Sequence, residues 1–218
     1  MNAPERADSY AWLPPPGAGP RSTCGEPPAR CAGCGLHELV CLCPELPRLS
    51  VRTRVVLLMH RAESRKSTNT GRLVARILEG SEIRIRGEQA PSVRRPLPEG
   101  RKLLLYPHAE ARILSPDDAL TQPLVLLVPD GNWNQARRMS RRDEDAREAE
   151  PVALPPGPPS RVGLRRNPRE ATLCTLEAVA RAMGVLEGAA IERCMMNALD
   201  TFIERSLRAA GRPARPPR

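Results

Sequence analysis

Apolar residues along the chain gather in short unbroken runs, and a polar loop follows each run. Three of these runs predict buried strands, at residues 53–60, 102–106 and 123–128. Ile83 and Ile85 alternate with polar neighbours and predict another strand, and residues 152–154 predict a short one. Runs without alternation are typical of strands in a parallel sheet that is covered on both faces.

Four segments between and after these runs have the apolar spacing of helices. The first follows capping residues at 67–70 and ends before Gly80. The second is a highly charged segment from 133 to about 149, and the last two have one apolar face each, over 175–186 and 191–203. Strands that alternate with helices predict an α/β fold, with a mainly parallel sheet flanked by helices.

Parallel sheets of this kind bind ligands in the loops at the carboxyl ends of their strands. Three polar loops follow the predicted strands, namely the segment from His60 onward, residues 106–108 and residues 129–132. The residues alone therefore predict a functional site at this edge of the sheet.

The length of the chain, 218 residues, is enough for one domain with a substantial hydrophobic core. Residues 1–23 predict a disordered, Pro-rich tail, and residues 211–218 a disordered basic tail. Between the tails we expect a cysteine-rich knuckle at 24–50 and an α/β domain at 51–210.

Basic residues outnumber acidic ones by 34 to 25, which gives a net charge of +9. Such a surface favours a polyanionic partner, with nucleic acid as the first candidate. Two Trp, two Tyr and one Phe are too few to form a broad stacking surface for single strands. No membrane-spanning run or secretory signal is present, so we expect a cytoplasmic protein with no membrane contact and no obligate protein partner.

Four cysteines lie close together in the sequence, as Cys31-x2-Cys34-x6-Cys41-x-Cys43. In a cytoplasmic protein such a cluster indicates a metal site rather than disulfides. Four thiolates predict one structural Zn²⁺ with closed tetrahedral coordination, and free or redox-active thiols are the alternative.

Three further cysteines lie outside this cluster. Cys24 precedes it by seven residues and is a possible substitute ligand. Cys174 and Cys194 are expected to be small, buried apolar residues rather than reactive thiols.

The loop after the third strand run, from Asp130 to Trp133, is open to two interpretations. In one, Asp130 and Asn132 are turn and cap residues, and Trp133 is an anchor in the core. In the other, the loop binds a ligand, because Gly131 allows a close approach to the backbone.

This loop resembles the Asp-x-Thr-Trp motif that names the DTW-domain family, with Asn132 where the family has Thr. Asn keeps a cap acceptor but lacks the hydroxyl. Other segments between about residues 31 and 202 resemble the family in the same order: the four cysteines, His60-x-x-Glu63, Asn69-Thr70-Gly71-Arg72-Leu73, Leu104 to Pro107, Leu164-Arg165-x-x-Pro168 and Thr175-Leu176-Glu177-Ala178. Each segment alone is a weak signal, whereas the ordered set is specific.

The resemblance implies a fold similar to the SPOUT-type RNA-modifying enzymes, including a C-terminal knot. It also implies transfer of the 3-amino-3-carboxypropyl group of S-adenosylmethionine to N3 of a tRNA uridine, in the variable loop as in bacterial members, with release of methylthioadenosine. Three alternatives remain open: an RNA methyltransferase of SPOUT type, an aminocarboxypropyltransferase that acts on rRNA, and a non-enzymatic zinc-knuckle RNA-binding protein.

By this resemblance Asp130 and Trp133 are the catalytic candidates. Asp130 would take the proton from uracil N3, or it would only orient the uracil or the donor. Thr175 is either a contact of the donor or an ordinary N-cap. The residues expected to bind S-adenosylmethionine are Leu105, Tyr106, Pro107, Asp130, Gly131, Asn132, Trp133, Leu164, Arg165, Thr175 and Glu177.

Basic residues near the predicted loops are expected to contact the phosphates of tRNA, which gives affinity and salt dependence rather than base choice. For the helix that carries Arg137 and Arg138, a solvated charged face is the alternative. His60 and Glu63 form either a pair in the site or a histidine whose bonding is satisfied at the strand end. The candidate RNA contacts are Arg61, Arg65, Lys66, Arg72, Arg137 and Arg138.

Overall fold

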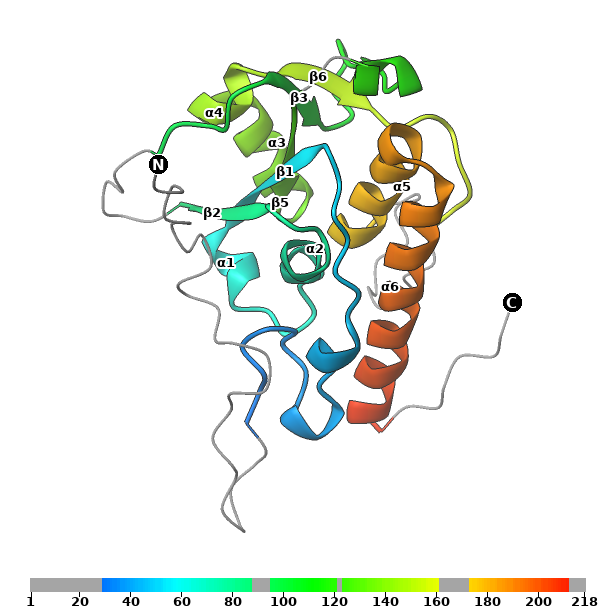
Figure 1. The fold of residues 1–218 in the computed structure, drawn as a ribbon. Coiled ribbons are helices and arrows are strands. Elements are labelled where there is room, and N and C mark those ends of the chain that lie inside the picture. Colours follow the sequence, from blue (N-terminus) through cyan, green and yellow to red (C-terminus); the bar gives the residue numbers. More distant parts are fainter. Residues whose placement is uncertain (1–28, 88–94, 121–122, 161–172, 212–218) are drawn as a thin grey trace, which may run out of the picture.

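A six-stranded sheet forms the centre of the computed structural model, which describes residues 29–87, 95–120, 123–160 and 173–211 (Figure 1). The strand order is β2-β1-β5-β3-β6-β4, and every pairing is parallel. This sheet confirms the predicted α/β class. The strands are β1 (Arg54–His60), β2 (Glu82–Arg86), β3 (Arg101–Leu105), β4 (Arg112–Ile113), β5 (Leu124–Asp130) and β6 (Glu150–Ala153).

Helices lie between several of the strands, and two long helices follow the last strand. The helices are α1 (Arg61–Ser64), α2 (Gly71–Ile77), α3 (Trp133–Arg142), α4 (Glu144–Arg147), α5 (Thr175–Glu187) and α6 (Ala189–Ala209), with short 3-10 helices η1 (Glu38–Val40), η2 (Cys43–Glu45) and η3 (Pro116–Leu120). The single helix predicted from 133 to 149 is wrong. Asp143 is extended between α3 and α4, and its Oδ1 accepts hydrogen bonds from the backbone N–H groups of Asp145 and Ala146. A cap of this kind begins a new helix.

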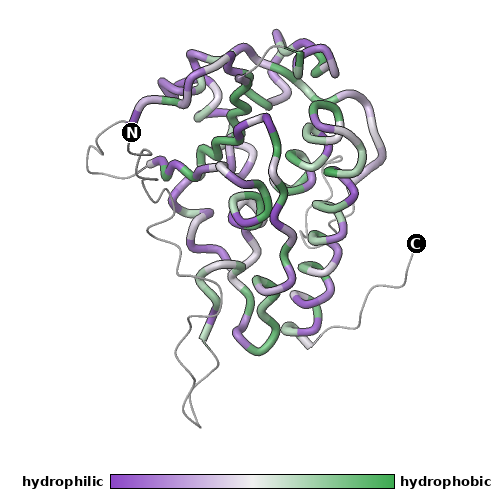
Figure 2. Tube along the Cα trace, in the orientation of Figure 1, coloured by the Kyte–Doolittle hydropathy of each residue, from purple (hydrophilic) through white to green (hydrophobic). Residues whose placement is uncertain are grey.

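Alternating side chains on the strands divide the core into two layers. Val55 and Leu57 of β1 belong to a cluster that also includes side chains of α2, α5 and α6. Val56 and Leu58 face the other way, into a cluster with α3 and α4. Helices therefore cover both faces of the sheet, which explains why its strands are hydrophobic without alternation. Figure 2 shows hydrophobic residues concentrated along these central strands.

The cysteine knuckle packs directly on the α/β domain. Cys34 and Leu42 lie in the same core cluster as the apolar side chains of α2 and α6. Arg205 of α6 donates from Nη1 to the carbonyl of Cys41 at 2.6 Å, and from Nη2 to the carboxylate of Glu45. The knuckle thus lies beside the C-terminal end of α6, at the bottom of the view in Figure 1.

Several predictions fall on residues outside the described ranges. These are the tail at 1–23, Cys24, nearly all of the tail at 211–218, and Leu164 and Arg165. The chain between β6 and α5 includes residues 161–172, which also lie outside these ranges, so the knot implied by the resemblance stays a prediction. None of the helices that the structure describes is long and apolar enough to cross a membrane.

An ion-pair network ties the first residues of three strands together. Arg112 of β4 donates to both carboxylate oxygens of Asp118, at 2.6 and 2.9 Å, and to Glu150 at the start of β6. Arg101 of β3 pairs with the same two carboxylates, at 3.1 and 2.7 Å. Hydrogen bonds from Arg112 lower the pKa of Asp118 and of Glu150 below their ordinary values.

We expect this network to make stability depend on pH in the acid range. Because the pKa of Asp118 is lower in the folded chain, its contribution is fully present above the ordinary carboxyl pKa of 3.8 and is lost progressively as pH falls from there through the lowered pKa of the folded chain. Asp118→Asn should therefore lower the melting temperature at pH 7 and should lower it by a smaller amount at pH 2.5. Thermal unfolding at both pH values measures this, and an equal loss at both values would contradict it.

Candidate functional site

Three segments that are distant in the sequence meet at the carboxylate of Asp130, the last residue of β5. The residue is only 3% exposed. Its Oδ2 accepts a hydrogen bond from Nδ2 of Asn69 at 2.7 Å, and its Oδ1 accepts one from Oγ1 of Thr175 at 2.5 Å. The carboxyl end of the sheet thus carries a buried anion with a side-chain donor on each oxygen.

The start of α2 is fastened to the start of α5 beside this carboxylate. Oδ1 of Asn69 accepts from the backbone N–H of Arg72 at 3.1 Å, and Oγ1 of Thr70 accepts from the backbone N–H of Leu176 at 3.3 Å. Asn69 is therefore both the capping side chain of α2 and a donor to Asp130. The capping role predicted for residues 67–70 is confirmed at Asn69, whereas Thr70 makes no cap bond with its side chain.

Gly71 lies against the carboxylate of Asp130. A Cβ at this position would overlap Oδ2 and press on Cγ, which is 3.1 Å away. Gly71 belongs to the segment at 69–73 that resembles the family, and the sequence predicts no separate role for it. A glycine in the first turn of a helix is unfavourable by propensity, and that was the available signal for a close approach.

The loop from Asp130 to Trp133 begins α3 with a complete capping box. Oδ1 of Asn132 accepts from the backbone N–H of Gln135 at 3.0 Å, and Oε1 of Gln135 accepts from the backbone N–H of Asn132 at 2.8 Å. The predicted cap at Asn132 is confirmed. The Asn that replaces the family Thr thus supplies the acceptor of the cap.

Trp133 is not an anchor in the core, because 61% of it is exposed. Its ring centroid lies 5.7 Å from that of Tyr106, which follows β3 and is largely buried. Burial raises the pKa of Tyr106, and the positive charges of Arg137 and Arg141 act in the opposite direction. An exposed indole thus lies against Tyr106, which is within electrostatic reach of Arg137 and Arg141.

Thr175 is not the N-cap of α5, which was one of its two predicted roles. The N-cap is Cys174, whose Sγ accepts from the backbone N–H of Glu177 at 3.4 Å, and the hydroxyl of Thr175 donates to Asp130 instead. Cys174 is buried as expected, whereas Cys194 is partly exposed. Glu177 is fully buried and accepts from Ser160 at 2.6 Å, as well as from Arg181.

The other residues predicted to bind the donor surround this junction in part. Leu105 is buried at the end of β3, and Pro107 is exposed in the loop after it. Gly131 lies between Asp130 and the cap, where a Cβ would meet the side chain of Gln135 at 2.8 Å. The donor contacts of Leu105, Pro107, Gly131 and Glu177 stay predictions.

Most of the predicted RNA contacts lie at the surface. Nζ of Lys66 pairs with the buried carboxylate of Glu63 at 2.5 Å, and Nδ1 of His60 accepts from the backbone of Ala62, so His60 is a satisfied strand-end histidine. Arg72 is only 8% exposed and donates to backbone carbonyls inside the protein. The structure therefore does not support its predicted contact with RNA. The predicted RNA contacts that are exposed are Arg61, Arg65, Lys66, Arg137 and Arg138.

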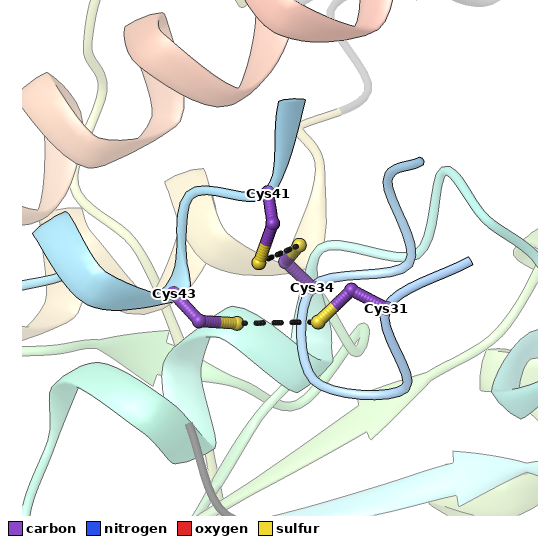
Figure 3. Close-up of side chains that lie close together, drawn as sticks. All are labelled: Cys31, Cys34, Cys41 and Cys43. Carbon is purple, nitrogen blue, oxygen red and sulfur yellow. Dashed lines mark hydrogen bonds between the residues drawn. The ribbon is translucent and has the colours of Figure 1, made fainter. Parts of the chain in front are cut away.

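The four cysteines of the knuckle point toward one common centre (Figure 3). Their sulfur atoms all lie within 4.8 Å of one another, with Cys31 and Cys43 at 3.7 Å and Cys34 and Cys41 at 3.8 Å. Sulfurs at about 2.3 Å from one tetrahedral Zn²⁺ are separated by about 3.8 Å. The donor set and its spacing therefore fit one metal ion.

The ionisation of the thiols also favours a cation at this centre. A hydrogen bond from Cys43 lowers the pKa of Cys34 to about 5, whereas burial raises the pKa of Cys41 to about 11. The hydrogen bond to Cys34 and burial raise the pKa of Cys43. One thiolate therefore forms readily and opposes the ionisation of its neighbours, which a divalent cation would stabilise together.

We expect one equivalent of zinc per chain, and we expect its loss to destabilise the fold. Cys41→Ser should abolish stoichiometric zinc and lower the melting temperature by about 10 °C, since each kcal/mol lost shifts it by about 2–4 °C in a domain of this size. Elemental analysis and thermal unfolding measure the two effects. Cys194→Ser, on α6, is the matched control and should retain zinc. Full zinc content in Cys41→Ser would show that the knuckle is not the site.

Comparison with known proteins gives a family for this arrangement. Residues 28–207 match the DTW domain. A protein named tRNA-uridine aminocarboxypropyltransferase 2 from Macaca fascicularis is 30% identical over 72% of this chain and 56% of its own length. The protein of that name from Drosophila melanogaster is 32% identical over 74% of this chain and 69% of its own length.

A more distant relative and the solved structures complete the comparison. Arabidopsis thaliana has a tRNA-uridine aminocarboxypropyltransferase A that is 27% identical over 79% of each chain. The chain thus spans just over half the length of the macaque relative and more of the other two. No solved structure matches the chain significantly. The domain match covers most of the chain and includes the knuckle, Asp130 and both C-terminal helices, so the chain belongs to the DTW-domain family.

Proposed function

We propose that this protein modifies tRNA by transferring the 3-amino-3-carboxypropyl group of S-adenosylmethionine to N3 of a uridine. The observation that carries the proposal is the convergence of Asn69, Asp130 and Thr175 at the carboxyl end of a parallel sheet. Ligands bind at this edge in such sheets. The names of the relatives suggest the reaction, and the net charge of +9 favours an RNA substrate.

The proposed reaction is a displacement at carbon. Uracil N3 gives up its proton to water and attacks the aminocarboxypropyl carbon that is bound to the sulfonium, the carbon–sulfur bond breaks, and methylthioadenosine leaves with the electron pair. The protein has to present that carbon, rather than the methyl carbon, to N3. Side chains that fix the donor therefore decide the product.

Asp130 is proposed to orient the site rather than to take the proton. Both of its oxygens accept hydrogen bonds from side chains, and the residue is almost fully buried. Acting as the base would require the uracil to reach a carboxylate that is only 3% exposed. Holding Thr175 at the start of α5 requires no contact between Asp130 and the uracil, and it fixes the first turn of the helix whose residues Thr175 and Glu177 are proposed to bind the donor.

Trp133 is proposed to stack on the target uracil or on a neighbouring base. An exposed indole is suited to this, because aromatic side chains stack on the faces of bases. Arginines of the same helix would bind the phosphates through their charge. Arg137 and Arg138 would contact phosphates next to the stacked base, and Arg61, Arg65 and Lys66 would extend that contact.

The remaining parts are proposed to support this site. Zn²⁺ in the knuckle would be structural, because four thiolates leave no open coordination position. The donor pocket would be completed by Leu164 and Arg165, and a C-terminal knot would hold the segment that binds it. The cytoplasm is the proposed compartment, since none of the six described cysteines is in a disulfide bond and metal binding requires reduced thiols.

The direct test is to incubate the purified, zinc-loaded protein with unmodified tRNA and S-adenosylmethionine, and then to analyse nucleosides and spent donor by mass spectrometry. We expect a uridine heavier by one aminocarboxypropyl group, and methylthioadenosine in equal amount. Fragment mapping then gives the position of the uridine, and rRNA fragments are the control for the choice of substrate.

Other products would identify a different function. A methylated nucleoside with S-adenosylhomocysteine would leave the donor site in place and replace the reaction. Modification of rRNA alone would replace the substrate. Binding of tRNA without any product would overturn the proposal and indicate an RNA-binding protein.

A further inference from the structure

Helix α2 places two arginine side chains against the cysteine knuckle. Nη2 of Arg72 donates to the carbonyls of Ser64 at 2.6 Å and Lys66 at 3.3 Å, and its Nη1 donates to the carbonyl of Ala32, between two of the cysteines, at 3.5 Å. The guanidinium of Arg76 lies beside Gly33, where a Cβ would meet its Nη2 at 2.6 Å. That same position is 2.8 Å from Sγ of Cys43.

Charge gives these two arginines a role toward a bound metal. One Zn²⁺ with four thiolates carries a net charge of about −2, which costs free energy in a partly buried place unless cations lie nearby. Arg72 and Arg76 supply two positive charges next to the sulfurs. Burial lowers the pKa of Arg72, and the negative charges of Cys34 and Asp130 act in the opposite direction. Arg72 therefore lies within electrostatic reach of both the knuckle and Asp130.

Hydrogen bonds connect the same arginine to the site at Asp130. Its backbone N–H donates to Oδ1 of Asn69, and Nδ2 of Asn69 donates to Oδ2 of Asp130. A path of three contacts therefore runs from the carbonyl of Ala32 through Arg72 and Asn69 to the carboxylate. The two contacts of Asn69 are buried and the contact with Ala32 is partly buried, and small displacements are transmitted where side chains are closely packed.

We propose that Arg72 is a positioning residue that sets Asn69 and Asp130 according to the placement of the metal-loaded knuckle. The metal centre then has a second role besides stability. It holds the loop of the knuckle that receives Arg72, and thereby aligns the junction at which the modification is proposed to occur.

Arg205 provides a matched comparison, because it also holds the knuckle but from the other side. Its guanidinium binds the carbonyl of Cys41 and the carboxylate of Glu45, and it lies on α6 rather than α2. Loss of Arg205 should loosen only the part of the knuckle around Cys41 and Glu45, and should leave the loop at Ala32 and Asn69 unchanged. Loss of Arg72 should loosen both.

Hydrogen–deuterium exchange on the full chain tests the coupling without any assay of activity. Removing zinc from the wild-type protein with a chelator should speed exchange in peptides that cover 67–73 and 129–132, by about tenfold or more. Arg72→Gln with zinc retained should do the same, whereas Arg205→Gln should speed exchange only at 38–45. Unchanged exchange at 129–132 after zinc removal, or equal effects of the two variants there, would overturn the proposal.

The second measurement rests on the proposed transfer reaction. Arg72→Gln should lower kcat at least tenfold with zinc still bound, and Arg205→Gln should leave kcat within twofold of the wild type. If the wild-type protein forms no product, the proposed function fails, while the exchange measurement still decides the coupling. If Arg72→Gln turns over normally in an active enzyme, the coupling fails and the proposed function stands.

A second variant covers the case in which Arg72→Gln does not fold. Arg72→Lys keeps the positive charge near the sulfurs but cannot bridge several carbonyls at once. We expect zinc to be retained and exchange at 129–132 to be faster than in the wild type. Wild-type exchange in Arg72→Lys would show that charge alone is required and would overturn the positioning role.

Discussion

Asp130→Asn is expected to lower the turnover of the proposed aminocarboxypropyl transfer by about 100-fold or more, while the chain stays folded. The amide has one acceptor oxygen where the carboxylate has two, so it cannot keep both hydrogen bonds: its NH2 group either faces the amide of Asn69 without an acceptor or reverses the bond with the hydroxyl of Thr175. Hydrogen bonds to a charged group are worth about 1.5–3 kcal/mol each, and an unsatisfied buried donor adds a further cost. Single-turnover transfer to tRNA, with donor binding measured by calorimetry, gives the effect.

Two companion variants separate orientation from proton transfer. Thr175→Val keeps the carboxylate and removes one donor. If Asp130 orients the donor loop, Thr175→Val should weaken donor binding and lower turnover about tenfold. If Asp130 is the base, donor binding should stay near the wild-type value in both variants. The control is Asp117→Asn, an exposed carboxylate in η3 that should behave as wild type. Near-wild-type turnover of Asp130→Asn with normal donor binding would remove Asp130 from the site.

Local sequence patterns predict the central strands well, because these strands are covered on both faces. Residues 55–59, 103–105 and 124–128 are apolar and buried without a break, so the strand ends are visible where the apolar run stops. The rule for parallel sheets then places the end of β5 and Tyr106 at the same edge. The sequence therefore predicts which loops form the site.

Contacts between distant segments could not be predicted in the same way. Asn69 and Thr175 reach Asp130 across 61 and 45 residues, and no local pattern states which side chain takes which oxygen. A tryptophan is usually expected in the core, yet Trp133, the first residue of α3 after the capping box of Asn132, is largely exposed. Arg72 has the character of a surface cation, yet carbonyls of the preceding loop receive it inside the protein.

Gly71, at the start of α2, is another position where a local pattern and a tertiary contact lead to different predictions. Helix propensity ranks glycine about 0.8–1.0 kcal/mol below alanine, so a local argument expects Gly71→Ala to stabilise α2. The tertiary contact predicts the opposite sign, because the position faces the carboxylate of Asp130. The sign of this substitution therefore tests which of the two levels governs the position.

Gly71→Ala is expected to destabilise the fold and to lower turnover by about 100-fold. The added methyl overlaps Oδ2 of Asp130 and lies 3.2 Å from Cε of Met59, so the carboxylate has to move away from Asn69. Overpacking of this kind costs about 1–3 kcal/mol, which corresponds to a fall in melting temperature of about 2–12 °C. Thermal unfolding and single-turnover transfer measure the two effects on the same sample.

Gly184→Ala is the matched control, because it adds the same methyl group inside another helix. Its methyl would overlap the carboxylate of Glu192, which is partly exposed and can move aside more readily than a buried carboxylate, and it would lie 3.0 Å from Cβ of Glu192, which requires a shift of a few tenths of an ångström between α5 and α6. We expect Gly184→Ala to change the melting temperature by no more than about 4 °C and to leave turnover unchanged. If Gly71→Ala is as stable and active as Gly184→Ala, the close approach to Asp130 does not constrain the site, and the carboxylate is free to move as a base would need to.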